Sequence, residues 1–240
     1  MTFDLAGKVV LVAGGTGGLG RAVSLAFLAE GAKVMVTCRK AEELDILRLS
    51  AGEQTEVLEG AQVDVTDEKA VAMLIDETMM KRHGRLDAVV NTVGGYAGGL
   101  KLWETEADVF NRMLNLNLRS GFALARAAMP VMLRQGRGVL VNVAAKAAVD
   151  HAAGASAYAA SKAAAVALFD SLAADAKGTG VRVNSILPSI IDTEVNRKAM
   201  PGAPFDQWPK PEEIAKVILF LASDQARVIH GASIPVYGNS

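Results

Sequence analysis

Short apolar runs alternate with longer segments of helical periodicity along almost the whole chain. The apolar runs are rich in Val, Leu and Ile, as is typical of strands that are buried on both faces of a sheet. They cover residues 8–13, 33–38, 55–63, 86–91, 138–145, 181–187 and 233–237. Between them, helical spacing covers residues 21–31, 68–83, 108–134 (two helices, with a break near Asn115), 155–177 and 212–222. Strands alternating with helices predict an α/β fold, a parallel doubly wound sheet of about seven strands with helices on both faces.

A glycine cluster follows the first predicted strand directly. Residues 14–20 read GGTGGLG and lead into the first predicted helix. Glycines here let the backbone turn tightly and approach a pyrophosphate, which then lies at the helix N-terminus. Strand, glycine turn, helix and strand are the opening unit of a Rossmann-type dinucleotide-binding domain. Since there is no internal repeat or linker, we expect a single such domain over residues 1–240.

The bulk properties exclude several functional classes. The chain has 240 residues, of which 21% are charged, and its net charge is −1. The sequence has no cluster of Lys and Arg residues that would indicate binding to nucleic acid. It also has no apolar run long enough to span a membrane. The single cysteine, Cys38, excludes an internal disulfide and a multi-cysteine metal site, and no other metal-ligand spacing occurs. The N-terminal residues do not resemble a signal peptide, so we expect a cytoplasmic protein.

Two side chains with complementary proton chemistry lie four residues apart in the predicted helix 155–177. Tyr158 and Lys162 would share one helix face, where an ammonium can stabilise an ionised phenol. Such a pair can give a proton to a substrate oxygen or take one from it. The spacing alone is weak evidence, because it also arises in helices with an interfacial Tyr and a solvated Lys.

Ordered motifs make the chain resemble the short-chain dehydrogenase/reductase family over essentially its whole length. Residues 13–20 resemble its TGxxxGxG turn with Ala13 in place of Thr, residues 91–94 its NNAG segment, and residues 158–162 its YxxxK motif. The resemblance implies a cofactor-binding set made of Gly14, Thr16, Gly18, Leu19, Gly20, Arg39, Asp64, Val65, Asn91, Gly94, Tyr158, Lys162, Pro188, Ile191 and Thr193. In this set Asp64 and Val65 would meet the adenine ring, and Thr193 would contact the nicotinamide carboxamide.

The family implies NAD(P)H-dependent hydride transfer, in which the protein positions the cofactor and manages one proton. Tyr158 would be the general acid in reduction, with its pKa lowered by Lys162 and the oxidised nicotinamide. Lys162 would also hold the nicotinamide ribose. Asn117 matches the asparagine that holds a proton-relay water. These three residues are the implied catalytic set.

The end of the second predicted strand bears on the choice of cofactor. A ribose-binding acid would be expected near position 38, where the chain has Cys38 followed by Arg39 and Lys40. A guanidinium can pair with a 2′-phosphate, so NADP is favoured and NAD stays an alternative. Gly17 weighs against NADP, because many NADP-using members carry a second basic residue at this position.

One departure from the family pattern concerns catalysis. The family's serine, thirteen residues before the tyrosine, is replaced here by Ala145. The missing hydroxyl would polarise a substrate carbonyl. Three explanations stay open: a protein retained for binding, another donor such as Lys146 or His151, or a substrate that needs no donor. Ser156 and Ser161 lie on the tyrosine's own helix and are poor substitutes.

The third explanation has a specific basis. Residues 144–150 and 192–201, with Phe205 and Trp208 beyond, resemble the quinonoid dihydropteridine reductases of the same family, which lack the serine. Their electron-poor acceptor takes hydride readily. The N-terminal half does not follow them, because they carry an acid after the second strand and favour NADH.

The loop over about residues 189–211 would cover the substrate. Ala145, His151, Met200, Phe205 and Trp208 are the candidate substrate residues, and Tyr96 and Trp103 are weaker ones. The substrate would be a small molecule, either a carbonyl compound of 3-oxoacyl type or a quinonoid pterin. The competing hypothesis is a catalytically weak dinucleotide-binding sensor or scaffold. Small residues along helix 155–177 favour a homodimer or homotetramer.

Overall fold

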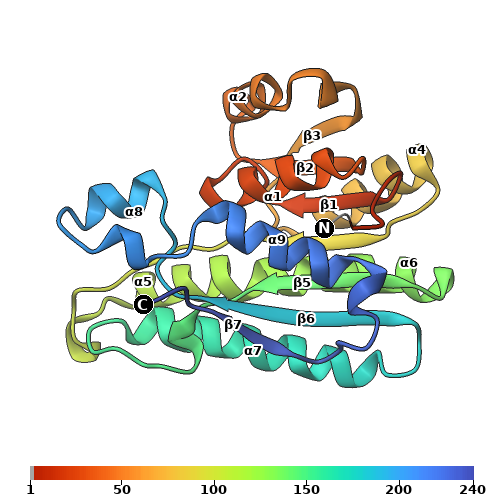
Figure 1. Ribbon diagram of the computed structural model, residues 1–240. Coiled ribbons are helices and arrows are strands. Elements are labelled where there is room, and N and C mark those ends of the chain that lie inside the picture. Colours follow the sequence, from red (N-terminus) through yellow and green to blue (C-terminus); the bar gives the residue numbers. More distant parts are fainter. Residues whose placement is uncertain (1–2) are drawn as a thin grey trace.

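Seven parallel strands form one sheet in the computed structural model, which describes residues 3–240 (Figure 1). The strands are β1 (Val9–Ala13), β2 (Lys33–Cys38), β3 (Leu58–Gln62), β4 (Ala88–Asn91), β5 (Gly138–Val143), β6 (Val181–Pro188) and β7 (Ser233–Val236). Their order across the sheet is β3-β2-β1-β4-β5-β6-β7. The order reverses between β1 and β4, and open α/β sheets bind ligands at such a switch point. The predicted doubly wound fold is confirmed.

Helices cover both faces of this sheet. They are α1 (Gly18–Ala29), α2 (Ala41–Ala51), α3 (Glu68–Met73), α4 (Lys81–His83), α5 (Ala107–Leu114), α6 (Ser120–Gln135), α7 (Ser156–Asp175), α8 (Glu194–Ala199) and α9 (Pro211–Ala222). One core cluster joins α1 and α9 to the sheet through residues such as Phe27 and Ile218. The other joins α6 and α7 to the opposite face through Leu124 and Phe169.

The apolar run of β1 shows why the strands form where they do. Val10 and Val12 pack into one core cluster, and Val9, Leu11 and Ala13 pack into the other. All five are at most 2% exposed, so both faces of the strand must be apolar. Burying each valine contributes about 1.5–3 kcal/mol. A charged residue at Val10 or Leu11 would lie unpaired in one of the two cores.

The structure corrects the sequence-based element assignment in several places. Residues 41–51, which the pattern left unassigned, form α2, and α8 lies inside the predicted substrate loop. The predicted strand 55–63 begins only at Leu58, because residues 52–57 form a 3₁₀ helix. The two helices predicted within residues 108–134 are α5 and α6, and the α-helical pattern changes at Asn115 as predicted. In place of an open break, a π-helical turn, Asn115–Arg119, joins the two helices.

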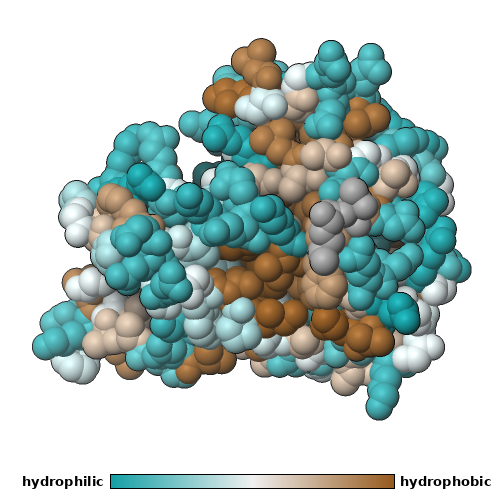
Figure 2. Space-filling model, in the orientation of Figure 1, coloured by the Kyte–Doolittle hydropathy of each residue, from teal (hydrophilic) through white to brown (hydrophobic). Residues whose placement is uncertain are grey.

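Some apolar residues on α9 and β7 are only partly covered by the rest of the protein. Hydrophobic residues gather on the face formed by α9 and β7 (Figure 2), where Val217, Phe220, Ile234 and Val236 are only partly buried. β7 is also an edge strand of the sheet. Among residues 3–240, no helix combines the length and the apolar character needed to cross a bilayer.

Candidate active site

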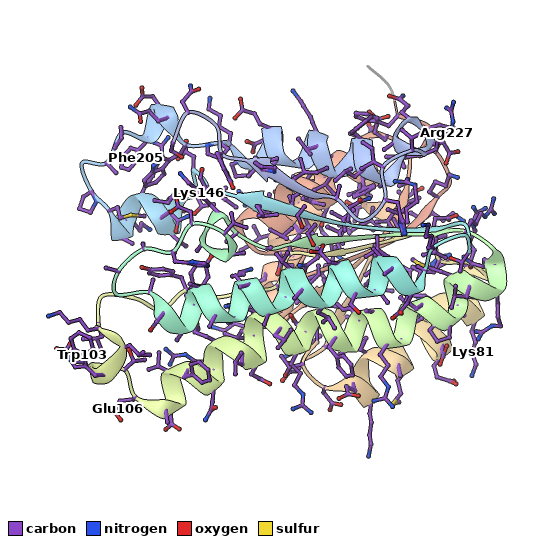
Figure 3. All side chains as sticks on the ribbon, turned by 90° about the horizontal axis from the view of Figure 1, so that it is seen from below. Lys81, Trp103, Glu106, Lys146, Phe205 and Arg227 are labelled. Atoms are coloured by element: carbon purple, nitrogen blue, oxygen red, sulfur yellow. The ribbon has the colours of Figure 1, made fainter. Side chains whose placement is uncertain are left out.

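The strand ends bring distant parts of the chain together. Ala13 pairs with Asn91, and Asn91 pairs with Asn142, so the carboxyl ends of β1, β4 and β5 lie side by side. Figure 3 shows Lys146 and Phe205, which follow β5 and β6, at the same end of the molecule as Trp103. Lys81 and Arg227 lie at the opposite end. The loops after the strands therefore form one shared site, as parallel α/β sheets dictate.

The glycine turn leaves no room for side chains where a dinucleotide would pass. A β-carbon at Gly20 would lie 2.0 Å from the Gly14 carbonyl oxygen, and one at Gly18 would lie 3.0 Å from the Thr193 methyl group. Gly14 itself has a φ of 73°, which favours glycine. The turn thus abuts the loop after β6, and its bare backbone at the start of α1 fits a pyrophosphate.

The residues predicted to hold the adenosine follow β2 and β3, close to the glycine turn. Arg39 is exposed directly after β2. The Asp64 carboxylate accepts hydrogen bonds from the Thr66 backbone at 2.9 Å and hydroxyl at 2.8 Å, while Val65 is buried beside it. The Thr16 hydroxyl donates to the Glu43 carboxylate at 3.0 Å. Glu43 belongs to helix α2, which the sequence pattern did not predict, and it lies beside the predicted cofactor residue Thr16.

Asn117 lies on the π-helical turn and is buried. Its amide nitrogen donates to the Ser161 hydroxyl at 2.9 Å and to the Gly95 carbonyl at 3.0 Å, and its oxygen accepts from the Gly95 backbone N–H at 2.9 Å. The extra residue of a π turn redirects side chains, and such turns recur at functional sites. Ser161 therefore orients Asn117, a role that its position beside Lys162 in sequence did not reveal.

Lys162 is buried on α7, with 5% of its surface exposed. Its Nζ donates to the Val143 carbonyl at 3.0 Å. Burial lowers the pKa of Lys162 from 10.5 to about 8. A β-carbon at Gly94 would lie 2.9 Å from Asn117 Oδ1 and 3.1 Å from Lys162 Nζ, so these two polar groups converge over Gly94. The structure brings the implied relay residues together.

Tyr158 lies half-buried one turn before Lys162 on α7. Its ring packs edge-on against Tyr96, with centroids 5.0 Å apart at 74°. Burial, and secondarily the neighbouring Tyr96, raises the pKa of Tyr158 to about 12. In the cofactor-free protein burial disfavours the phenolate, and the Lys162 ammonium donates to the Val143 carbonyl. A lowering of this pKa by Lys162 and the oxidised nicotinamide stays a prediction for the cofactor-bound protein.

Ala145 follows β5 in extended conformation and is 6% exposed. The two proposed replacement donors have other partners. Lys146 Nζ donates to the Ser240 carbonyl at 3.4 Å and pairs with Asp150 at 3.7 Å. His151 is exposed and lies 3.3 Å from the Ala148 carbonyl. Replacement of the serine hydroxyl by either residue stays a prediction.

The predicted substrate residues of the 189–211 segment form a local cluster. Phe205 and Trp208 pack edge-on with centroids 5.0 Å apart, and Trp208 is only 5% exposed. Arg197 lies over the Phe205 ring. Met200 is half-buried, and Thr193 caps α8 by accepting from the Asn196 backbone N–H at 3.3 Å. Trp208 is therefore part of the buried interior of this segment, and Phe205 is the more accessible of the two rings.

The remaining predicted cofactor residues have structural contacts near the carboxyl ends of the strands. The Asn91 amide donates to the Asn142 side chain at 3.1 Å, and its oxygen accepts from the Val93 backbone. Leu19 and Pro188 are buried, and Ile191 packs partly against the α1–α9 core. Surface cavities of about 950 and 920 Å³ lie elsewhere, along α3, α5 and α6, and neither is lined by the catalytic set.

The doubly wound sheet, the glycine turn at the start of α1 and the Tyr158–Lys162–Asn117 constellation define a dinucleotide-dependent oxidoreductase. Comparison with known proteins supports this assignment to the oxidoreductases. The sequence model of the short chain dehydrogenase family matches residues 8–203. The chain belongs to this family.

Curated relatives match over nearly the full length of both chains. The 3-oxoacyl-[acyl-carrier-protein] reductase FabG of Thermotoga maritima is 32% identical over 98% of this chain and 98% of its own. The meso-2,3-butanediol dehydrogenase of Serratia marcescens is 34% identical over 100% of this chain and 96% of its own. The solved structure of ElxO with NADP bound has a TM-score of 0.91 and 28% identity, covering 97% of this chain and 98% of that one.

Proposed function

We propose that this protein is an NADPH-dependent reductase that transfers hydride to a reactive carbonyl group of a small molecule. The observation that carries the proposal is the convergence of Lys162 and Asn117 over Gly94, after β4, with Tyr158 one turn before Lys162 on α7. The NADP-bound relative and the 3-oxoacyl reductase relative support this cofactor and this substrate class.

The residues of the cradle fit a dinucleotide. The bare turn at Gly14, Gly18 and Gly20 would receive the pyrophosphate, and Asp64 with Val65 would meet the adenine ring. Arg39 would pair with the 2′-phosphate, since a guanidinium matches phosphate geometry. When bound, NADPH supplies the hydride.

The protein's own residues would handle the proton. With a pKa of about 12, Tyr158 holds its proton at neutral pH and can donate it to the substrate oxygen as that oxygen gains charge. Lys162, with a pKa lowered to about 8 by burial, still carries its proton at neutral pH and can return a proton toward the phenolate. Asn117, fixed by Gly95 and Ser161, would hold the relay between Lys162 and solvent.

The alanine at position 145 restricts the classes of substrate that the protein would reduce efficiently. Without a hydroxyl at this position, the carbonyl oxygen of a simple ketone receives one hydrogen bond fewer. Loss of such a hydrogen-bond donor commonly lowers the rate by a factor of roughly a hundred to a thousand. We therefore favour activated acceptors: a 3-oxoacyl thioester, or, as the second candidate, a conjugated quinonoid pterin. The half-exposed Phe205 ring beyond Thr193 gives a flat acceptor an aromatic surface.

The proposal is tested by steady-state oxidation of NADPH with a 3-oxoacyl thioester, simple ketones and quinonoid dihydropterin, using wild type and Tyr158→Phe. We expect turnover on at least one activated acceptor and a loss of about a hundredfold or more in Tyr158→Phe. Turnover that is unchanged in Tyr158→Phe would contradict the mechanism. Tight NADPH binding without turnover on any acceptor would favour the sensor or scaffold hypothesis instead.

We also propose that the protein assembles into a homodimer or homotetramer. The support is the partly open apolar face of α9 and the edge strand β7, in addition to the small residues of α7. Light scattering of the purified protein tests this directly, and a mass of one chain at micromolar concentration would contradict it.

A further inference from the structure

Glu43 lies where the glycine turn, β2 and α2 meet. It belongs to the first turn of α2 and is half-buried, although it is charged. Its Oε2 accepts the Thr16 hydroxyl hydrogen at 3.0 Å, which ties α2 to a turn 27 residues earlier in the chain. The carboxylate is therefore held beside the cradle rather than turned to solvent.

A second observation places the same carboxylate at the end of β2. The pKa of the Cys38 thiol is raised first by burial and next by the charge of Glu43, which acts more strongly than Arg48 or Glu42. Cys38 ends β2, and the exposed Arg39 follows it. Glu43 thus lies near Thr16 of the glycine turn and near Cys38 at the end of β2, the two segments that would flank the adenosine ribose. Arg39, the residue proposed to pair with the 2′-phosphate, is the next residue after Cys38 in the sequence.

A carboxylate in this place has a defined chemistry. Its oxygens accept hydrogen bonds from ribose 2′- and 3′-hydroxyl groups, as the acidic residue of NAD-binding folds does. The same charge repels a 2′-phosphate. In this chain, however, the acid comes from α2 and not from the end of β2, where Cys38 stands.

Resting on the proposed function, we propose that Glu43 is a specificity-determining residue that opposes Arg39. Its carboxylate limits the affinity for NADPH and supports binding of NADH, so that the protein binds both dinucleotides with a moderate preference. Removing the charge converts it into a strongly NADPH-selective protein. The alternative role is purely structural: Glu43 only fastens α2 to Thr16.

The variant Glu43→Gln separates these roles. Glutamine keeps an oxygen that can accept the Thr16 hydrogen bond, but it carries no charge. Glu42→Gln is the matched control, because it removes the same charge from the neighbouring, exposed position on the same helix. Melting temperatures of the cofactor-free proteins that agree within about 2 °C show that both variants fold as the wild type does.

The readout is the dissociation constant of each dinucleotide, measured by titrating the protein with NADPH or NADH and following nicotinamide fluorescence. In Glu43→Gln we expect the NADPH constant to fall about tenfold and the NADH constant to rise about threefold. In Glu42→Gln each constant should change less than about twofold. The gain for NADPH should shrink in high salt, which screens the removed charge.

The outcomes distinguish this inference from the proposed function. A ratio of NADPH to NADH affinity that changes equally in Glu43→Gln and Glu42→Gln overturns the role of Glu43 and leaves the reductase proposal standing. Wild-type protein that binds neither dinucleotide overturns both.

Discussion

The amide nitrogen of Asn117 donates to the hydroxyl oxygen of Ser161 at 2.9 Å, and this contact joins the π-helical turn to α7. The Ser161 hydroxyl in turn donates to the Tyr158 backbone carbonyl at 2.7 Å. Both side chains are almost fully buried. The orientation of the Asn117 amide is therefore set by the same helix turn that carries Tyr158 and Lys162.

The first prediction is that Ser161→Ala lowers kcat about tenfold by leaving one Asn117 N–H unpaired in a buried site. The KM for cofactor should stay within about twofold, and the solvent isotope effect on kcat should increase because proton transfer becomes slower. Ser156→Ala is the control, since the Ser156 hydroxyl is buried without a hydrogen-bond partner among residues 3–240. Equal kinetics in the two variants would contradict a positioning role for Ser161.

The second prediction concerns the burial of Lys162. Its pKa falls from 10.5 to about 8, and each pKa unit corresponds to about 1.4 kcal/mol, so the buried charge destabilises the folded protein by about 3 kcal/mol at pH 7. Lys162→Met removes this charge but also the hydrogen bond to Val143, worth about 1 kcal/mol. We expect cofactor-free Lys162→Met to be about 2 kcal/mol more stable than wild type at pH 7, although it should lose activity.

The sign of the pH dependence follows from proton binding. Below pH 8 both folded and unfolded wild type carry the Lys162 proton, so the destabilisation is complete. Between about pH 8 and 10 the unfolded chain keeps a proton that the folded protein loses, and wild-type stability therefore rises with pH. The advantage of Lys162→Met should vanish over this range in urea unfolding. The exposed Lys177→Met should show no such trend.

Much of this arrangement was predictable because it depends on local pattern. The β1 run is apolar on both faces, and the glycines of residues 14–20 mark a turn that tolerates no side chain. Tyr158 and Lys162 lie one turn apart on α7 because they are four residues apart on a helix. In each case a short stretch of sequence determines the geometry.

The parts that sequence reading missed depend on tertiary context. Helix α2 buries only Leu44, Leu47 and Ala51, and so narrow an apolar stripe among charged residues gives a weak helical pattern in the sequence. The contact of Glu43 with Thr16 then could not be foreseen. The burial of Tyr158 and the Lys162–Val143 contact, which raise the pKa of Tyr158 in the cofactor-free protein and orient the Lys162 ammonium respectively, are properties of the packed site and not of the motif.

The third prediction tests cofactor recognition at the end of β2. Arg39→Ala should weaken NADPH binding about tenfold to a hundredfold, because a charge-assisted pair with the 2′-phosphate is lost, and should change NADH binding less than about twofold. Fluorescence titration of both dinucleotides measures this. Lys33→Ala, an exposed cation at the opposite end of the same strand, is the control. Equal weakening of NADH and NADPH would rule out a phosphate-specific role for Arg39.

The fourth prediction addresses the absent serine. Ala145→Ser should raise kcat/KM for simple ketones about tenfold or more, since it supplies a second donor beside Tyr158, and should raise it little for a quinonoid pterin that already accepts hydride readily. Ala144→Ser is the matched control. Ala144 is similarly buried and directly precedes Ala145, so the same hydroxyl is introduced one residue away from the position of the family's serine. If both substitutions change ketone reduction alike, the effect does not come from a donor at position 145. If Ala145→Ser has no effect, another group or the substrate itself already covers the role of the missing hydroxyl.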